Sequence, residues 1–454
     1  MRDPSMRQRT TARVAAPTPR PLALPRPRAE HHAARALERC DALAACTEAP
    51  GLLLRRCLTP AMGDAHTRLG AWMEDAGLEV RVDAIGNLRG RLPAPASPDA
   101  PTLYIGSHLD TIRDAGKYDG PLGVVLGLGM LEAVQELGLA LPYAVEVVGF
   151  ADEEGVRFAR PFLGSRALTG TFPGADLALE DDEGVRLDEA MARFAAARGE
   201  ELGAPRRALA EARFEPERAL GYLELHIEQG PVLESQGLPV GVVTAIAGHC
   251  WQTLHFTGRA GHAGTTPMNL RRDALAGAAE LALAVEALGR DVPDLVATVG
   301  AIEARPGGNN VIAGHAAVEV DVRSPDAGRL ERALLDLRAA AESIARRRDL
   351  KLEPELHFDQ APVRMDSGLR GLLVEAVRDA EQPVHEMPSG AGHDARIVAP
   401  LVPSAMLFLR SPEGLSHHPD ESVLPGDVAV ALEVSVAFLQ RLAARFEGRA
   451  EATS

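Results

Sequence analysis

IGSHLDT at residues 105–111, followed by KYDG at residues 117–120, is the stretch around which the rest of the chain is organised. The apolar run before His108 predicts a buried strand, and two acids, Asp110 and Asp119, follow its end. Imidazole and carboxylate groups bind divalent zinc or manganese, and Asp110 is placed to accept the second ring N–H of His108. Pro121 suits the first turn of the apolar helix that comes next. A strand–loop–helix unit with polar capping and no metal would have the same residues. Other parts of the chain are needed to choose between this alternative and a metal site.

Two further predicted strands end in residues of the same kind. The strand at 143–150 ends before Asp152, Glu153 and Glu154, three adjacent acids that repel one another unless a cation lies between them. The strand at 221–225 leads directly into His226. Ligands of open α/β sheets gather outside the carboxyl ends of the strands. A solvated acidic loop would explain one such strand end, but the repetition favours a metal site.

Composition and charge exclude several classes of protein. The chain has 454 residues and a formal net charge of -16, which argues against nucleic acid or an anionic membrane as the main partner. The sequence contains no apolar run of the ~20 residues needed to span a bilayer. Its four cysteines show no paired spacing and fit reduced thiols in the cytoplasm.

The order of predicted elements indicates two domains, one inserted in the other. Residues 33–247 and 360–454 alternate strands and helices, as expected for an α/β domain with a mixed sheet flanked by helices. Residues 248–359 follow the β-α-β-β-α-β order of a ferredoxin-like α+β domain. Residues 1–32 are rich in Arg and Pro, and we expect a disordered basic tail there or an upstream start codon.

A series of motifs occurs in order along the chain, and together the motifs resemble one family. They are GSHLDT with GKYDGPLGV, FADEEGVRF, ELHIEQGP, GHAGTTPM, NNVIAG with DVR, SGAGHDA and GLSHHPDE. The set resembles the amidase branch of the M20-type metallohydrolases, which holds allantoate amidohydrolases, N-carbamoyl-L-amino acid hydrolases and β-ureidopropionases. The resemblance covers residues 36–445. It implies a metal-dependent hydrolase domain and an inserted domain that serves as lid and dimerisation domain.

The resemblance also implies a metal centre. A single zinc needs three or four ligands, so five candidates suggest two divalent ions per subunit, zinc or manganese, with cobalt or nickel as alternatives. Peptidase members usually have an Asp where this chain has His226, which points to the ureido-cleaving branch. The family pattern selects His417 rather than His418. The implied metal ligands are His108, Asp119 as the bridge, Glu154, His226 and His417.

Catalytic and substrate-binding residues follow from the same resemblance. Glu153 matches the general base, and Asp110 is a further catalytic candidate because of its place beside His108. His262, contributed by the partner subunit of a homodimer, is a candidate oxyanion donor, although it could be an ordinary turn histidine. Arg323 can bind a substrate carboxylate, although a strand Arg often forms a surface ion pair. The candidate substrate-binding residues are Gln229, His262, Asn310, Arg323 and His393, and His393 could instead support the metal ligands.

The implied reaction is hydrolysis of the ureido C–N bond of allantoate to ureidoglycine, ammonia and carbon dioxide. The substrate class is a small carboxylated ureido compound, so N-carbamoyl-L-amino acid hydrolase and β-ureidopropionase activities stay open as alternatives. An M20-type peptidase or deacylase and a non-catalytic binding protein are also possible. Against the last alternative, every position that matches a ligand or the base is filled.

Overall fold

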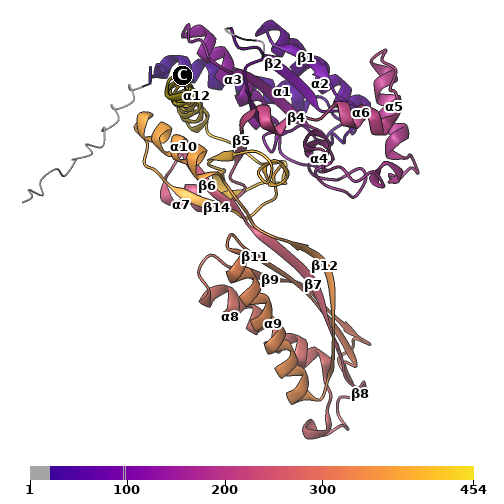
Figure 1. Cartoon of the computed structure of the whole chain (residues 1–454). Helices are drawn as coiled ribbons and strands as arrows, with labels where there is room; N and C mark the ends of the chain where they lie inside the picture. The colour runs from indigo at the N-terminus through magenta and orange to yellow at the C-terminus, as the bar shows by residue number, and fades with distance from the viewer. Residues whose placement is uncertain (1–20, 96, 98, 454) are drawn as a thin grey trace, which may run out of the picture.

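The computed structural model describes residues 21–453 except 96 and 98. Within these residues the larger of two parts is built on a nine-stranded mixed sheet in the order β1-β2-β4-β3-β5-β15-β6-β13, with β14 paired to β6 (Figure 1). Strands β4, β3, β5 and β15 are parallel to their neighbours in this series, so their carboxyl ends meet at one edge. The strands are β1 (Glu79–Val82), β2 (Leu88–Leu92), β3 (Thr102–His108), β4 (Ala144–Phe150), β5 (Ala219–Ile227), β6 (Val240–Ile246), β13 (Val363–Arg364), β14 (Glu386–Ser389) and β15 (Ser404–Leu409).

Helices cover both faces of this sheet. One apolar core lies between the sheet and five helices: α1 (Arg26–Ala44), α2 (Pro60–Asp75), α3 (Pro121–Glu136), α10 (Ser367–Asp379) and α12 (Pro425–Thr453). A smaller core on the opposite face includes residues of α4 (Leu163–Thr169) and α11 (Ala395–Val398). Shorter helical elements complete this part: η1 (Asp176–Ala178), α5 (Leu187–Ala197), α6 (Pro205–Glu211), η2 (Pro216–Arg218), α7 (Val232–Gln236) and η4 (Pro412–Gly414).

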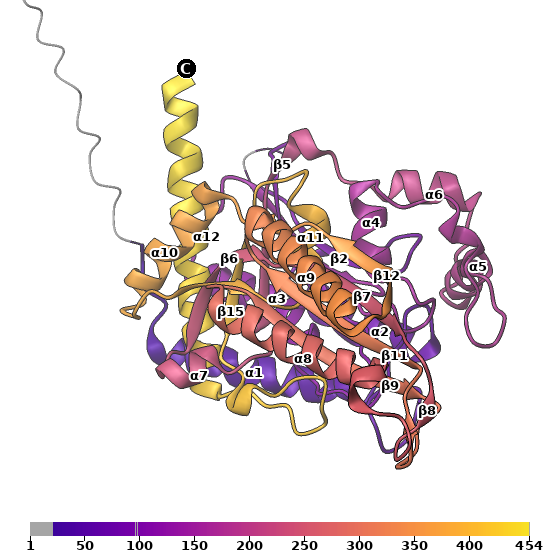
Figure 2. The same ribbon diagram turned by 90° about the horizontal axis from the view of Figure 1, so that it is seen from below.

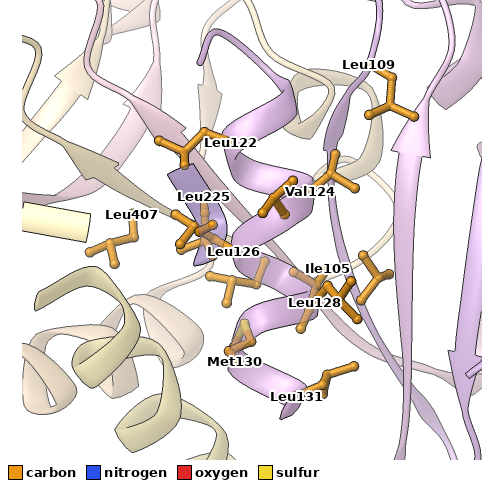
Figure 3. Packing of buried hydrophobic residues seen from close by; sticks show 14 of the residues in the cluster. Ile105, Leu109, Leu122, Val124, Leu126, Leu128, Met130, Leu131, Leu225 and Leu407 are labelled. Carbon is orange, nitrogen blue, oxygen red and sulfur yellow. The ribbon is translucent and has the colours of Figure 1, made fainter. Parts of the chain in front are cut away.

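Helix α3 fixes the position of the strand ends that carry the predicted site. Its residues 121–131 are all apolar and buried, as expected for a helix in the core of a protein. Its side chains pack among Ile105 of β3, Leu225 of β5 and Leu407 of β15 (Figure 3). A Cβ at Gly123 would lie 2.0 Å from the carbonyl oxygen of Leu225, so only glycine permits this close approach to β5.

The smaller part is the inserted segment. It contains β7 (Gly248–Thr257), α8 (Ala274–Asp291), β9 (Val296–Arg305), β11 (His315–Ser324), α9 (Ala327–Arg348) and β12 (Lys351–Gln360). The four strands form an antiparallel sheet in the order β12-β7-β11-β9, with α8 and α9 on one face (Figure 2). This is the ferredoxin-like arrangement, and the predicted fold class is confirmed. A ribbon of β8 (Gly261–His262) and β10 (Val311–Ile312) lies at the far tip, with η3 (Met268–Leu270) beside it in sequence.

One prediction about the N-terminus is wrong. The disordered tail was expected to include residues 26–32, but α1 begins at Arg26, and Ala29 and His32 are buried. Packing of α1 against α3 and α12 provides tertiary contacts that outweigh the basic composition. Residues 1–20 lie outside the described part of the chain. Among the described residues, no helix is long and apolar enough to cross a membrane.

Candidate active site

The predicted metal ligands come together in one cavity at the carboxyl edge of the parallel strands. His108 ends β3, Glu154 follows β4, His226 lies near the end of β5, and His417 lies in the loop after β15. Asp119 immediately precedes the Gly–Pro start of α3. All five side chains line a cavity of about 320 Å³, together with Glu153.

Asp119 lies at the centre of this group. Its Oδ1 is 3.2 Å from Nε2 of His226 and 3.8 Å from Nε2 of His108. Its Oδ2 is 3.1 Å from Nε2 of His417, and that nitrogen is 3.4 Å from Oε1 of Glu154. The two oxygens of one carboxylate therefore face different sets of ligand atoms, as a carboxylate shared by two cations requires.

The same residues fit a pair of divalent cations. Their ligand atoms lie within 4.8 Å of one another in three overlapping groups. Oδ1 of Asp119 and Nε2 of His226 are buried without a hydrogen-bond partner, and buried polar atoms of this kind are rare unless something else satisfies them. Mixed imidazole and carboxylate ligands suit zinc or manganese. The three groups are His108, Asp119 and His226; His108, Glu153 and Glu154; and Asp119, Glu154 and His417.

The buried carboxyl groups of the site need a positive charge to remain ionised. Burial raises the pKa of Glu154 to about 7, and burial also raises the pKa of Glu153 well above its usual range. Divalent cations reverse this effect because they stabilise the ionised form. Glu154 would then be a competent ligand, and Glu153 would be a base whose pKa depends on the bound metal.

Asp110 differs from its predicted arrangement. Nδ1 of His108 lies 3.0 Å from the main-chain carbonyl oxygen of Asp110, whereas the nearest Asp110 carboxylate oxygen is 3.7 Å away. That carboxylate instead accepts hydrogen bonds from the backbone N–H groups of Glu153 and Glu154, both at 3.0 Å. The expected bond between the Asp110 carboxylate and His108 is therefore wrong. The carboxylate orients the acidic loop, because two backbone donors pull it away from the ring.

Sequence reasoning missed two residues that hold Asp119. Oε1 of Glu421 accepts hydrogen bonds from the backbone N–H groups of Tyr118 and Asp119, at 2.9 and 3.1 Å. Oγ of Ser416 lies 3.0 Å from Oε2 of Glu421 and 3.1 Å from Oδ2 of Asp119. The only signal was the acid four positions after His417 in the GLSHHPDE motif. This network fixes the orientation of the central carboxylate.

Two of the predicted substrate-binding residues line the cavity. Nε2 of Gln229 donates to Oδ2 of Asp119 at 3.0 Å. Arg323 forms the ion pair with an acid that the alternative expected: its Nε and Nη2 donate to the Asp321 carboxylate at 2.9 Å each, and its Nη1 donates to the carbonyl oxygen of Gly390 at 2.8 Å. A guanidinium has five N–H donors, so both terminal nitrogens keep one for a ligand.

The other predicted residues lie elsewhere. His393 is buried beneath the cavity, with Nε2 2.8 Å from Oγ of Ser389 and its ring 4.5 Å from the ring of His226. It thus supports a metal ligand from behind. His262 and Asn310 are exposed in and beside the β8–β10 ribbon at the far tip of the inserted part (Figure 1). Neither residue lines the cavity of its own chain.

Comparison with known proteins agrees with this geometry. The sequence profile of peptidase family M20/M25/M40 matches residues 104–441. The chain belongs to this family. Among M20 relatives, the N-carbamoyl-L-amino acid amidohydrolase of Geobacillus stearothermophilus is 39% identical, covering 85% of this chain and 92% of that protein. Allantoate deiminase 2 of Glycine max is 37% identical, and the match covers 90% of this chain and 89% of that protein.

A solved structure shows the same fold. The amidase of the hydantoinase/carbamoylase family from Burkholderia multivorans is 32% identical, has a TM-score of 0.84 and covers 90% of this chain and 98% of its own. The predicted M20 branch is confirmed by these relatives. The chain is accordingly a hydrolase of carbon–nitrogen bonds other than peptide bonds, in a family of ureido-cleaving amidohydrolases.

Proposed function

We propose that this M20 enzyme uses two divalent cations to hydrolyse the ureido C–N bond of allantoate, with ureidoglycine, ammonia and carbon dioxide as products. The supporting observation is one cavity that joins a His–carboxylate cluster to the guanidinium of Arg323. Allantoate carries a ureido group and a carboxylate, so it can occupy both ends of such a cavity. The four cysteines are free and buried, which supports a cytoplasmic location.

The chain's own residues take distinct parts in this reaction. A bound cation pair supplies charge that polarises the ureido carbonyl and lowers the pKa of a water molecule. Glu153 accepts a proton from that water and passes it to the leaving nitrogen. Arg323 holds the substrate carboxylate through its free terminal N–H groups, and Gln229 offers an amide to the ureido group.

His262 acts in the neighbouring subunit of a homodimer. Within its own chain His262 lies in the ribbon at the far tip, away from the cavity. A second copy of the chain can bring that tip to the first copy's cavity, where the imidazole would donate a hydrogen bond to the developing oxyanion. Asn310 lies in the same ribbon and would approach the substrate with it. The inserted part is then required for activity as well as for dimerisation.

The alternative substrate is an N-carbamoyl-L-amino acid. Phe162 and Phe358 line the cavity and offer apolar surface to an amino acid side chain, whereas His249 and Gln360 offer hydrogen bonds to the second ureido group of allantoate. β-Ureidopropionate has neither a side chain nor a second ureido group, so it would contact neither the apolar pair nor the hydrogen-bonding pair of residues. Peptide hydrolysis is less well supported because His226 stands where M20 peptidases usually have an Asp.

A substrate panel tests the proposal. Protein reconstituted separately with zinc and with manganese should be assayed for ammonia release and for loss of substrate with allantoate, N-carbamoyl amino acids, β-ureidopropionate and dipeptides. We expect the highest kcat/KM with allantoate. A preference for N-carbamoyl amino acids would contradict the proposal that allantoate is the substrate. Turnover of dipeptides alone would contradict the proposal that the enzyme cleaves ureido groups.

A further inference from the structure

The inserted part is joined to the larger part at two chain crossings within the described residues. One crossing runs from the end of β6 through Ala247 to β7, and the other from the end of β12 through Ala361 and Pro362 to β13. These crossings set the angle between the two parts. Arg323 belongs to the inserted part, whereas the metal ligands belong to the larger part. The geometry of the crossings therefore determines where the guanidinium of Arg323 lies relative to the metal cluster.

One side chain binds both crossings. Arg396 lies in α11, three residues after His393, and is 8% exposed. Its Nη1 donates to the carbonyl oxygen of Ala361 at 3.2 Å, and its Nη2 donates to the carbonyl oxygen of Ala247. A planar guanidinium can donate to two separated carbonyls at once, and a lysine ammonium has no such fork. Arg396 also borders the cavity.

The surroundings of the crossings are tightly packed. A Cβ at Gly248 would lie 2.7 Å from side-chain atoms of Leu330 and Pro362, so the first crossing has no spare space. The backbone N–H of Ala247 donates to the carbonyl oxygen of Ser389 at 2.8 Å. The next residue, Gly390, accepts the hydrogen bond from Arg323. The segment from Ser389 to Arg396 thus contacts both crossings and the predicted carboxylate-binding residue.

We propose that Arg396 is a positioning residue that fixes the angle of the inserted part and so holds Arg323 at the distance from the metal cluster that a carboxylated ureido substrate requires. The proposal rests on the function proposed above. Arg396 acts through the main chain at Ala247 and Ala361, and it does not bind the substrate carboxylate itself. Its loss should weaken substrate binding far more than metal binding.

The first test is independent of substrate. Spin labels placed at Arg207→Cys in α6 and Arg338→Cys in α9 report the distance between the two parts by double electron–electron resonance. Both positions are exposed and the native cysteines are buried, so labelling is selective. A large excess of unlabelled chain removes distances between subunits. We expect Arg396→Met to broaden the distance distribution at least twofold, and an unchanged distribution would overturn the proposal.

Two further variants separate a specific effect from general damage. Arg396→Gln keeps an N–H donor for one carbonyl and should give an intermediate width. Arg364→Met is the matched control, because the exposed side chain of Arg364 also joins the two parts, through an ion pair with Asp326 at 3.1 Å. Exposed ion pairs contribute little stabilisation, so the distance distribution of this variant should match that of the wild type. Equal broadening in Arg364→Met would contradict a special role for Arg396.

The second test is a double-mutant cycle in the metal-loaded enzyme. Arg396→Met should raise KM for the carboxylated substrate about tenfold while kcat and metal content change less than about threefold. In the Arg323→Ala background the same change should have little further effect on KM, because the two residues act through one contact. Additive effects would show that Arg396 binds substrate directly and would overturn the proposal. Absence of activity on every ureido substrate would instead contradict the proposed function, and the distance measurement would still decide the role of Arg396.

Discussion

Asp119 is the residue on which the proposed metal centre depends. Oδ1 faces His226 and His108, and Oδ2 faces His417. Its backbone N–H donates a hydrogen bond to Glu421, and its Oδ2 accepts hydrogen bonds from Gln229 and Ser416. A carboxylate held from several directions cannot rotate freely. This rigidity is what a ligand shared by two cations needs.

Replacement of Glu153 tests the proton-transfer step. Glu153→Gln keeps the size of the side chain but removes the base, so we expect kcat to fall by about 10²–10⁴-fold. Metal content, measured by mass spectrometry of the digested protein, should remain near that of the wild type. Glu183→Gln, an exposed acid on the same part of the chain, is the control and should be fully active. Full activity of Glu153→Gln would contradict the assignment of the base.

Substitution of Gly120 tests how closely the chain packs against His108, a predicted metal ligand. The φ of 83° at Gly120 disfavours any side chain, and a Cβ there would lie 2.4 Å from Cε1 of His108. We expect Gly120→Ala to displace the imidazole and to lower metal affinity by at least about tenfold. Gly138→Ala is the matched control, since Gly138 has a φ of 66° and open space around it. Equal metal affinity in both variants would show that His108 is not a ligand.

At the scale of elements, the proposed action of the β8–β10 ribbon in another subunit can be tested by mixing variants. Mixing Glu153→Gln with His262→Ala after reversible subunit dissociation should restore activity. A hybrid dimer then has one site with an intact base and an intact partner imidazole, so an equal mixture should recover about a quarter of wild-type activity. No recovery would show that His262 acts within its own chain or has no role.

The sequence predicted the elements whose pattern is local. The apolar helix after Pro121, the parallel strands and the β-α-β-β-α-β insert follow from periodicity and turn residues. The ligand cluster was predictable because His108, Glu154 and His226 each lie at or just after the end of one of these strands. The start of α1 was missed because tertiary packing, rather than local composition, determines it.

Residues that act through the main chain left little signal in the sequence. Glu421 and Arg396 bind backbone atoms far away along the chain, at Asp119 and at Ala247 and Ala361. Such contacts depend on the assembled fold and on no local motif. The hydrogen-bond partner of the Asp110 carboxylate was predicted wrongly for the same reason, because its actual partners are backbone N–H groups in a different loop.

For the whole molecule, a buried histidine makes stability depend on pH. His66 is buried beside Phe194 without a hydrogen-bond partner, and burial lowers its pKa to about 3. Below the unfolded-state pKa of about 6.5, His66 binds a proton in the unfolded chain but stays neutral in the folded chain. The folded state therefore loses stability as the pH falls from about 6.5 towards 3.

Replacement of His66 measures this effect. We expect His66→Leu to lose less stability than the wild type between pH 7 and pH 4.5, by on the order of 2 kcal/mol. Urea unfolding of the full chain at several pH values gives the comparison. The carboxyl groups of the site contribute to acid sensitivity in both proteins and cancel in the difference. Parallel curves for the two proteins would contradict the role of His66.

The central claim is that five side chains, brought from separate strand ends, hold two cations in one cavity. Anomalous X-ray diffraction from crystals of manganese- or zinc-loaded protein measures this directly. The account predicts two anomalous peaks about 3.5–4 Å apart. Asp119 should contact both peaks, with His108, Glu154, His226 and His417 divided between them. A single peak, or peaks outside the cavity bordered by these residues, would contradict the account.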